Sequence, residues 1–230
     1  MQVVALVFPH MTQLDLTGPL EVFSRFKELS IHLAWKSLDP VKSGGGLPIM
    51  PTVDFASCPQ ADILFVPGGP GQLALMDDAE TLEFIRRQAG GAHYITSVCT
   101  GSLILASAGL LTGYRATCHW MSLAQLSYFG AEPVAERVVE DRDRITGAGV
   151  TSGIDFALLL TARIFGIERA RLVQLSMEYD PKPPFTGGSP ASANPGEAER
   201  LLDAVRDFNH KREVAAKKAA EALRANSTTG

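Results

Sequence analysis

Short apolar runs alternate along the chain with segments in which apolar residues recur at helical spacing. A continuous apolar run is typical of a strand covered on both faces, and a spacing of three or four residues is typical of a helix with one buried face. Strands are predicted at 3–8, 31–38, 61–66 and 93–98. Helices are predicted at 16–26, 79–90, 100–109, 154–166 and 197–224. Antiparallel hairpins with glycine or charged turns are predicted at 41–55 and 137–146.

Strands that alternate with helices predict an α/β fold with a mostly parallel sheet and helices on both faces. Ligands of such sheets bind at the carboxyl ends of the strands. Four segments lead from a strand into a helix: 9–19, 67–71, 99–102 and 147–153. Three of them are rich in glycine, serine and threonine, which permit close backbone approach and leave free N–H groups at helix starts. We therefore predict a substrate-binding edge that includes Gly68, Gly69, Val150 and Thr151.

Composition narrows the class of protein. Hydrophobic residues make up 46% and charged residues 20% of the 230 residues, which is typical of a globular protein rather than a disordered one. The net charge is −4 and there is no long basic run, so nucleic acid is not an expected partner. The apolar N-terminus lacks a basic region and ends at Pro9, so a first strand is predicted rather than a signal peptide. No apolar run approaches the ~20 residues of a membrane span.

The domain organisation follows from a change in composition near residue 180. We predict one α/β domain over 1–180, a connector rich in proline, glycine and serine over 181–196, and a C-terminal helix and tail over 197–230. The last helix either packs on its own domain or contributes to a dimer. The three cysteines have no framework spacing, which predicts a reduced, cytoplasmic protein.

Cys99 stands where a strand is predicted to turn sharply into a helix. Such a turn projects its side chain into the cleft, as it does for the serine of α/β-hydrolases. The start of the following helix supplies partial positive charge, which predicts a lowered pKa for the thiol and a nucleophilic role. The alternative is a small, packed and inert cysteine.

The residues predicted around Cys99 each have a structural alternative. Asp15 is a candidate general acid/base or a helix N-cap, and Thr100 either bonds the sulfur or substrate or caps its helix. The N–H groups of Gly68 and Gly69 could stabilise an anion or simply form a tight turn. His119 could complete a Cys–His–Asp triad, although a capping or packing role is favoured. No spacing matches a metal-ligand template, so no metal is predicted.

Four separated segments resemble the ThiJ/PfpI superfamily: VFPHMTQLDLTGPLEVF, FVPGGPG, SVCTGSLILASAGLLTGYRATCHW and TGAGVTSGIDFALLL. The resemblance covers about residues 3–180 in order. It implies a flavodoxin-like three-layer sandwich, similar to the class I glutamine amidotransferases, in which helices flank the sheet. To this we add the predicted C-terminal helical extension.

Within the superfamily, DLTGP and CTGS resemble most the members that hydrate an isocyanide to an N-substituted formamide. The resemblance implies that Cys99 is the nucleophile, Asp15 the acid/base and Thr100 a hydrogen-bonding neighbour. A thioimidate would form on Cys99 and be hydrolysed by water. The resemblance implies a homodimer that takes a small isocyanide substrate and needs no metal or organic cofactor.

Other branches of the superfamily define the alternatives. Protease-type members have a histidine where Thr100 stands, and the chaperone and deglycase branch has a glutamate where Asp15 stands. Members fused to a helix-turn-helix regulator need roughly 100 further residues for the DNA-binding module, and only about 50 residues follow Tyr179. A non-catalytic redox or stress sensor that uses Cys99, and a different hydrolytic or glyoxalase-like activity, stay open as hypotheses.

Overall fold

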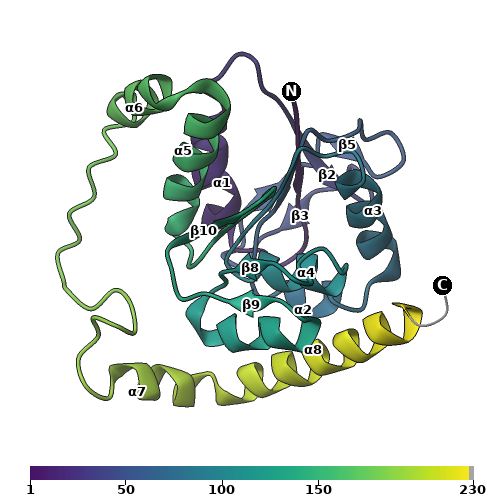
Figure 1. Cartoon of the computed structure of the whole chain (residues 1–230), viewed down its shortest axis with the longest axis vertical. Coiled ribbons are helices and arrows are strands. Elements are labelled where there is room, and N and C mark those ends of the chain that lie inside the picture. The colour runs from purple at the N-terminus through teal and green to yellow at the C-terminus, as the bar shows by residue number, and fades with distance from the viewer. Residues whose placement is uncertain (228–230) are drawn as a thin grey trace.

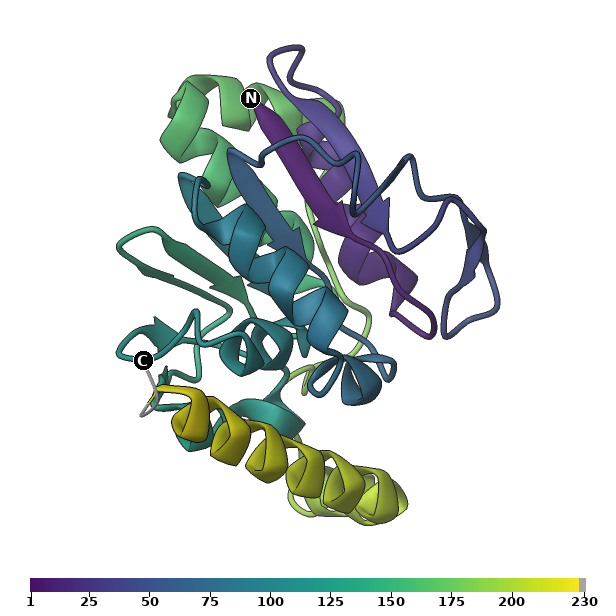
Figure 2. The ribbon, with the colours of Figure 1, turned by 90° about the vertical axis from the view of Figure 1, so that its right-hand side faces the viewer.

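The computed structural model describes residues 1–227. Its centre is a seven-stranded sheet in the order β10-β11-β7-β6-β1-β2-β5, visible in Figures 1 and 2. The strands of this sheet are β1 (Gln2–Leu6), β2 (Ser30–Trp35), β5 (Val53–Asp54), β6 (Ile63–Val66), β7 (Tyr94–Val98), β10 (Val138–Asp141) and β11 (Arg144–Gly147). All neighbours are parallel except β10 and β11, which form the predicted polar-turned hairpin.

Helices cover both faces of the sheet, which makes three layers. The helices are α1 (Gln13–Phe23), α2 (Gln72–Leu75), α3 (Ala79–Ala89), α4 (Gly101–Ser107), α5 (Ser152–Phe165), α6 (Ile167–Ser176), α7 (Glu197–Ala204) and α8 (Arg206–Ser227). Helices α1 and α5 pack against each other on one face, and α3 and α4 pack on the other (Figure 1). The strand β6 is buried along its whole length, as its continuous apolar run predicts. The predicted α/β class and flanked parallel sheet are confirmed.

Small elements complete the domain. The strands β3 (Val41–Lys42) and β4 (Pro48–Ile49) form the antiparallel excursion predicted from its glycine-rich turn. The last part of the predicted hairpin region 41–55 does not belong to a hairpin. It forms β5, which pairs with β2 in the main sheet. The 3₁₀ helix η1 (Trp120–Phe129) lies between β8 (Arg115–Ala116) and β9 (Glu132–Pro133), which pair with each other.

The C-terminal segment departs from the prediction in one respect. Residues 181–196 contain no helix or strand, and the segment after them forms two helices, α7 and α8, instead of one over 197–224. Val205 separates them with a non-helical backbone (φ −117°, ψ 20°). Helix α8 then packs against η1 and α4, so that it crosses one end of the domain (Figures 1 and 2). The last residues of the predicted tail, 228–230, lie outside the described residues, and no helix within 1–227 has the length and hydropathy of a membrane span.

Candidate active site

Asp15 is positioned by the first turn of α1. The helix begins at Gln13, before the predicted start, so the N-cap is Thr12 and Asp15 is not a capping residue. Its side chain is completely buried, and its Oδ2 atom accepts a hydrogen bond from the Gly68 N–H at 3.0 Å. Its other oxygen, Oδ1, receives no hydrogen bond from the residues that the structure describes.

Cys99 occupies the turn between β7 and α4 in a left-handed conformation, with φ of 59°. A non-glycine residue rarely adopts this region, which costs backbone energy and recurs at functional sites. The Cys99 N–H donates to the Gly147 carbonyl at 2.9 Å, and this bond ties the turn to the loop that precedes α5. The predicted sharp passage from strand to helix is present.

Glycines allow the neighbouring loops to approach this turn. The Gly69 N–H donates to Thr100 Oγ1 at 2.9 Å. Gly69 has φ of 129°, and a Cβ atom there would lie 2.2 Å from the Thr12 nitrogen. The N–H groups of Gly68 and Gly69 are thus engaged by Asp15 and Thr100, so both glycines hold side chains of the site in place. Their direct contact with a substrate stays a prediction.

Burial governs the protonation of the two reactive side chains. Desolvation raises the pKa of Asp15 to about 7, and hydrogen bonding to Cys99 and Gly68 opposes part of that rise. The pKa of the Cys99 thiol is raised well above its ordinary value, first by burial and then by the charges of Asp15 and Cys118. The Thr100 N–H lowers it only in part. The predicted lowering of the thiol pKa by the helix start is therefore wrong in direction, because desolvation exceeds the helix contribution.

His119 begins η1 and has the capping role favoured from the sequence. Its Nδ1 atom accepts the Met121 N–H at 3.3 Å, and its ring stacks on Trp120 with centroids 6.0 Å apart. Burial, followed by the charge of Arg212, lowers the pKa of His119, so the imidazole is neutral. Within the described residues the hydrogen bond of His119 is local, and it does not join Cys99 and Asp15 in a triad.

Val150 and Thr151 lie in the loop before α5. Val150 is half-buried and packs on the core, whereas Thr151 is exposed. The Arg137 side chain donates to the Thr151 carbonyl at 3.2 Å and pairs with Asp155, which fixes the loop from outside. The contact of Val150 and Thr151 with a substrate stays a prediction.

Comparison with known proteins identifies the family of this chain. Residues 1–163 match the profile of the DJ-1/PfpI family. The chain belongs to the DJ-1/PfpI family. The sequence is 52% identical over 193 residues to an isonitrile hydratase of Pseudomonas putida, a match that spans 84% of this chain and 85% of that protein. The resemblance to the ThiJ/PfpI superfamily is therefore confirmed.

Two further relatives show what varies in this family. The crystal structure of a ThiJ/PfpI family protein from Pseudomonas syringae superposes with a TM-score of 0.91 and 47% identity, covering 94% of this chain and 90% of that one. The transcriptional regulator GbdR of Pseudomonas aeruginosa is 31% identical over 183 residues. That match covers 76% of this chain and 50% of the regulator, so half of the regulator has no counterpart in it.

Arg212 is a residue near the site that the sequence analysis did not find. It extends from α8, is only 5% exposed, and donates to the Met121 carbonyl at 3.2 Å and to Asn209 Oδ1 at 2.5 Å. The Cys118 and Cys99 thiols both act on its pKa, which burial lowers. A signal was present in the sequence, because Arg212 shares a helical face with the buried residues Ala216 and Ala219. This pattern was difficult to recognise in the sequence, because exposed lysines and arginines lie on either side of Arg212.

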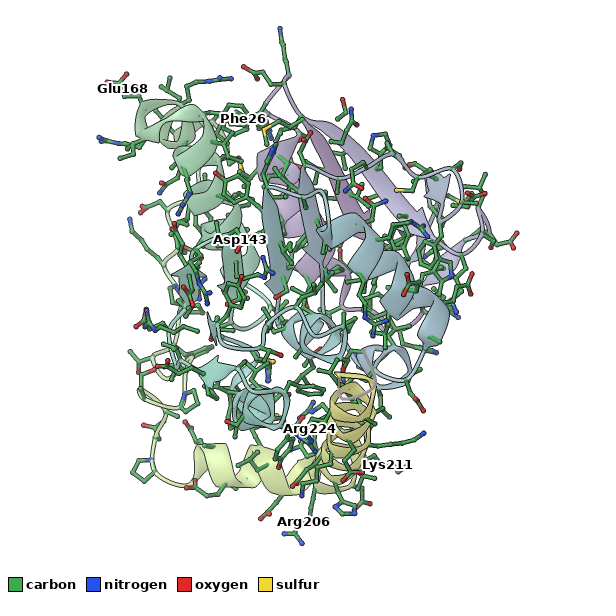
Figure 3. The ribbon with its side chains drawn as sticks, turned by 45° about the vertical axis from the view of Figure 1, so that its right-hand side comes forward. Phe26, Asp143, Glu168, Arg206, Lys211 and Arg224 are labelled. Carbon is green, nitrogen blue, oxygen red and sulfur yellow. The ribbon has the colours of Figure 1, made fainter. Side chains whose placement is uncertain are left out.

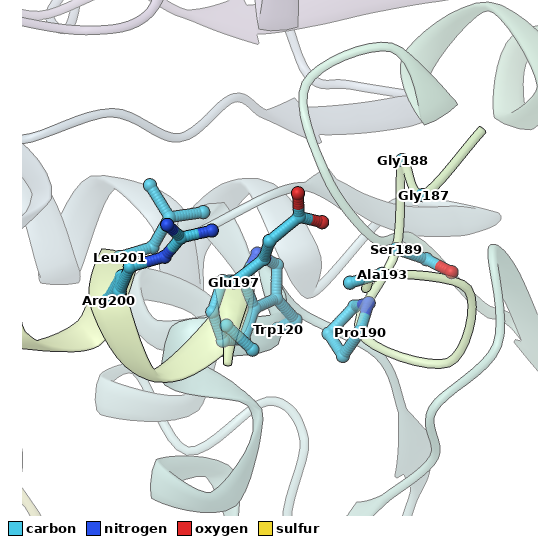
Figure 4. Close-up of a pocket in the computed structure, with 10 residues that line it drawn as sticks. Trp120, Gly187, Gly188, Ser189, Pro190, Ala193, Glu197, Arg200 and Leu201 are labelled. Carbon is cyan, nitrogen blue, oxygen red and sulfur yellow. The ribbon is translucent and has the colours of Figure 1, made fainter. Parts of the chain in front are cut away.

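A pocket of about 550 Å³ opens between Trp120, α7 and the connector, as Figure 4 shows. Glu197, Arg200 and Leu201 line it from α7, and residues 187–190 line it from the connector. Cys99 and Asp15 do not line this pocket. Among the described residues no three histidine, cysteine or acidic side chains gather as a metal site.

Proposed function

We propose that this DJ-1/PfpI protein hydrates an isocyanide to an N-substituted formamide, with Cys99 as nucleophile and Asp15 as acid/base. The observation that carries the proposal is the buried Asp15 carboxyl, with pKa about 7, held beside a cysteine on a strained turn. An acid/base works best when its pKa lies near the working pH. The 52% identity to an isonitrile hydratase supports the choice of substrate class.

The first half-reaction forms a thioimidate. Ionised Asp15 takes the proton of the neutral Cys99 thiol while the sulfur attacks the terminal carbon of R–N≡C. Asp15 then delivers this proton to the same carbon, which gives R–N=CH–S–Cys99. The raised pKa of the thiol suits this order, because its proton leaves only when the carbon accepts the sulfur.

The second half-reaction consumes one water. Asp15, again ionised, takes a proton from water as the hydroxyl group adds to the thioimidate carbon, and the proton passes to nitrogen. The adduct R–NH–CH(OH)–S–Cys99 collapses as the C–S bond breaks, and the hydroxyl proton returns through Asp15 to sulfur. The product is R–NH–CHO, and the enzyme is regenerated. During these steps the Gly69 N–H bonds the Thr100 hydroxyl and the Thr100 N–H bonds the Cys99 sulfur. These two bonds keep the loops around the site in place.

A redox-sensor role is disfavoured by the burial of Cys99, which is 4% exposed. Sensor cysteines are accessible and have a lowered pKa, whereas the pKa of Cys99 is raised.

A turnover assay separates the hydratase function from the sensor function. Purified protein should convert cyclohexyl isocyanide to its formamide, and Cys99→Ala should abolish turnover while the half-buried control Cys58→Ala retains it. Oxidation of Cys99 by peroxide in a protein without turnover would favour the sensor.

We also propose that the protein acts in the cytoplasm as a homodimer. The three cysteines are free, which suits a reducing compartment. Large apolar side chains on α6 are exposed, with Ile167 at 69% and Leu175 at 75%, and a second copy would cover them. Light scattering of purified protein tests the oligomeric state, and Leu175→Lys should yield a monomer if α6 forms the interface.

A further inference from the structure

Three buried polar atoms lie between α8 and η1 without a hydrogen-bond partner among the described residues. They are Nε of Arg212, Oγ of Ser122 and Oε1 of Gln125. Ser122 and Gln125 are three residues apart on a 3₁₀ helix, and this spacing places them on one face. Tyr128 continues the same face and bonds Glu213 of α8 at 2.9 Å, which shows that this face meets α8. Buried polar groups are normally paired, so this cluster lacks an occupant.

No acidic side chain that the structure describes neutralises the charge of Arg212. Its two hydrogen bonds go to neutral oxygens, the Met121 carbonyl and the Asn209 amide, and no carboxylate within residues 1–225 lies at ion-pair distance from it. A buried charge without a counterion costs several kcal/mol. The nearest titratable groups cannot supply one: burial raises the pKa of the Cys118 thiol to about 12, and His119 is neutral. An anionic group of a ligand would supply the missing counterion.

The cluster of Arg212, Ser122 and Gln125 is connected to Cys99 through the packing of α4. Cys99 precedes α4, and α4 packs against both η1 and α8. Arg212 bonds the carbonyl of Met121, whose N–H bonds His119 at the start of η1. By contrast, Arg206 and Lys211 of the same helix project outward, as Figure 3 shows. Arg212 is thus buried and interacts electrostatically with the Cys99 thiol, while Arg206 and Lys211 face solvent.

We propose that Arg212 binds the carboxylate of an isocyanide that carries one, and so selects anionic isocyanides as substrates. This inference rests on the proposed hydratase function. The Nε–H of Arg212 is the free donor, and it offers a carboxylate oxygen one charge-assisted hydrogen bond, since both hydrogens of Nη2 are already donated to Met121 and Asn209. The Ser122 hydroxyl adds a second donor from η1.

The test compares isocyanoacetate with its neutral methyl ester. Wild-type protein should have the higher kcat/KM for isocyanoacetate. Arg212→Met should lower kcat/KM for isocyanoacetate at least about tenfold more than for the ester, because a charged pair is lost only with the anion. Arg212→Lys, which keeps the charge without the Nε–H donor, should give an intermediate ratio. Lys211→Met removes an exposed charge from the same helix and should leave the ratio unchanged. Equal rates of both substrates in the wild type, or equal losses in Arg212→Met, would overturn the proposal.

A binding measurement separates this proposal from the hydratase function itself. Calorimetry with N-formylglycine, the product of isocyanoacetate hydration, and with its methyl ester requires no turnover. The wild type should bind the carboxylate more tightly than the ester, and Arg212→Met should remove that preference. If neither isocyanide is hydrated but this preference is present and depends on Arg212, the hydratase proposal fails and the carboxylate site stands. If hydration occurs and the wild type binds acid and ester alike, the carboxylate site fails alone.

Discussion

Replacing Asp15 by asparagine should stabilise the fold at neutral pH while it removes activity. The carboxyl is completely buried, and its pKa is raised from 3.8 to about 7 mainly by desolvation. The folded state therefore binds this proton more tightly than the unfolded state does. Between these two pKa values, stability must fall as the pH rises. Asparagine keeps an acceptor for the Gly68 N–H but has no charge to desolvate.

The size of the effect follows from the shift. A difference from 3.8 to about 7, at about 1.4 kcal/mol per pKa unit, amounts to about 4 kcal/mol. This cost is absent below the unfolded pKa, grows through the acid range and is complete above the folded pKa. The advantage of Asp15→Asn should therefore increase by about 1.4 kcal/mol per pH unit from about pH 4 to about pH 7 and then level off.

Urea unfolding of both proteins at several pH values between about 5 and 8 measures this difference directly. Asp180→Asn is the matched control, because Asp180 is exposed and paired only with Lys182 at the surface. Its effect should be small and nearly independent of pH. A pH-independent difference between wild type and Asp15→Asn, or a variant that becomes less stable than wild type as the pH rises, would refute the assignment of a raised pKa to Asp15.

Two further predictions concern turnover. Because Asp15 must be ionised to accept the thiol proton, kcat/KM for a neutral isocyanide should rise with pH through a pKa of about 7; a formamide assay across this range checks it, and a flat profile would exclude Asp15 as the base. Gly101→Ala should impair both turnover and stability, since its Cβ would lie 2.1 Å from the Val66 carbonyl. Gly188→Ala, where nothing lies within 4 Å, is the control in the same thermal unfolding and activity measurements.

The central fold could be predicted because its signals are local. The strands β1 and β6 contain short apolar runs, and the hairpin at β10 and β11 has a polar turn. The predictions that were wrong depend on contacts between distant segments. The two residues of β5 carry too little pattern to show that they pair with β2, and Val205 interrupts the last helix without a glycine or proline to mark the break.

The candidate site could be located but not described fully. The turn at Cys99 and the loop that bears Asp15 were predicted to meet because both follow parallel strands, and the structure brings them together. Thr100 stands at the N-cap position of α4, where its hydroxyl accepts from Gly69 and makes no capping hydrogen bond, and its predicted contact with a ligand stays a prediction. Arg212 was missed because its relation to Cys99 depends on how α8 packs across the domain.

The thiol pKa shows why residue types alone do not decide chemistry. A helix start beside a cysteine favours the thiolate, but that effect is worth only about 1 kcal/mol and acts within the first turn. Removing a thiolate from water opposes it by more, and the Asp15 charge adds to the opposition. The sign thus depends on burial, which only the packed structure supplies. A neutral thiol beside a carboxyl with pKa about 7 is suited to a substrate whose carbon accepts both the sulfur and the proton, and an isocyanide carbon does both.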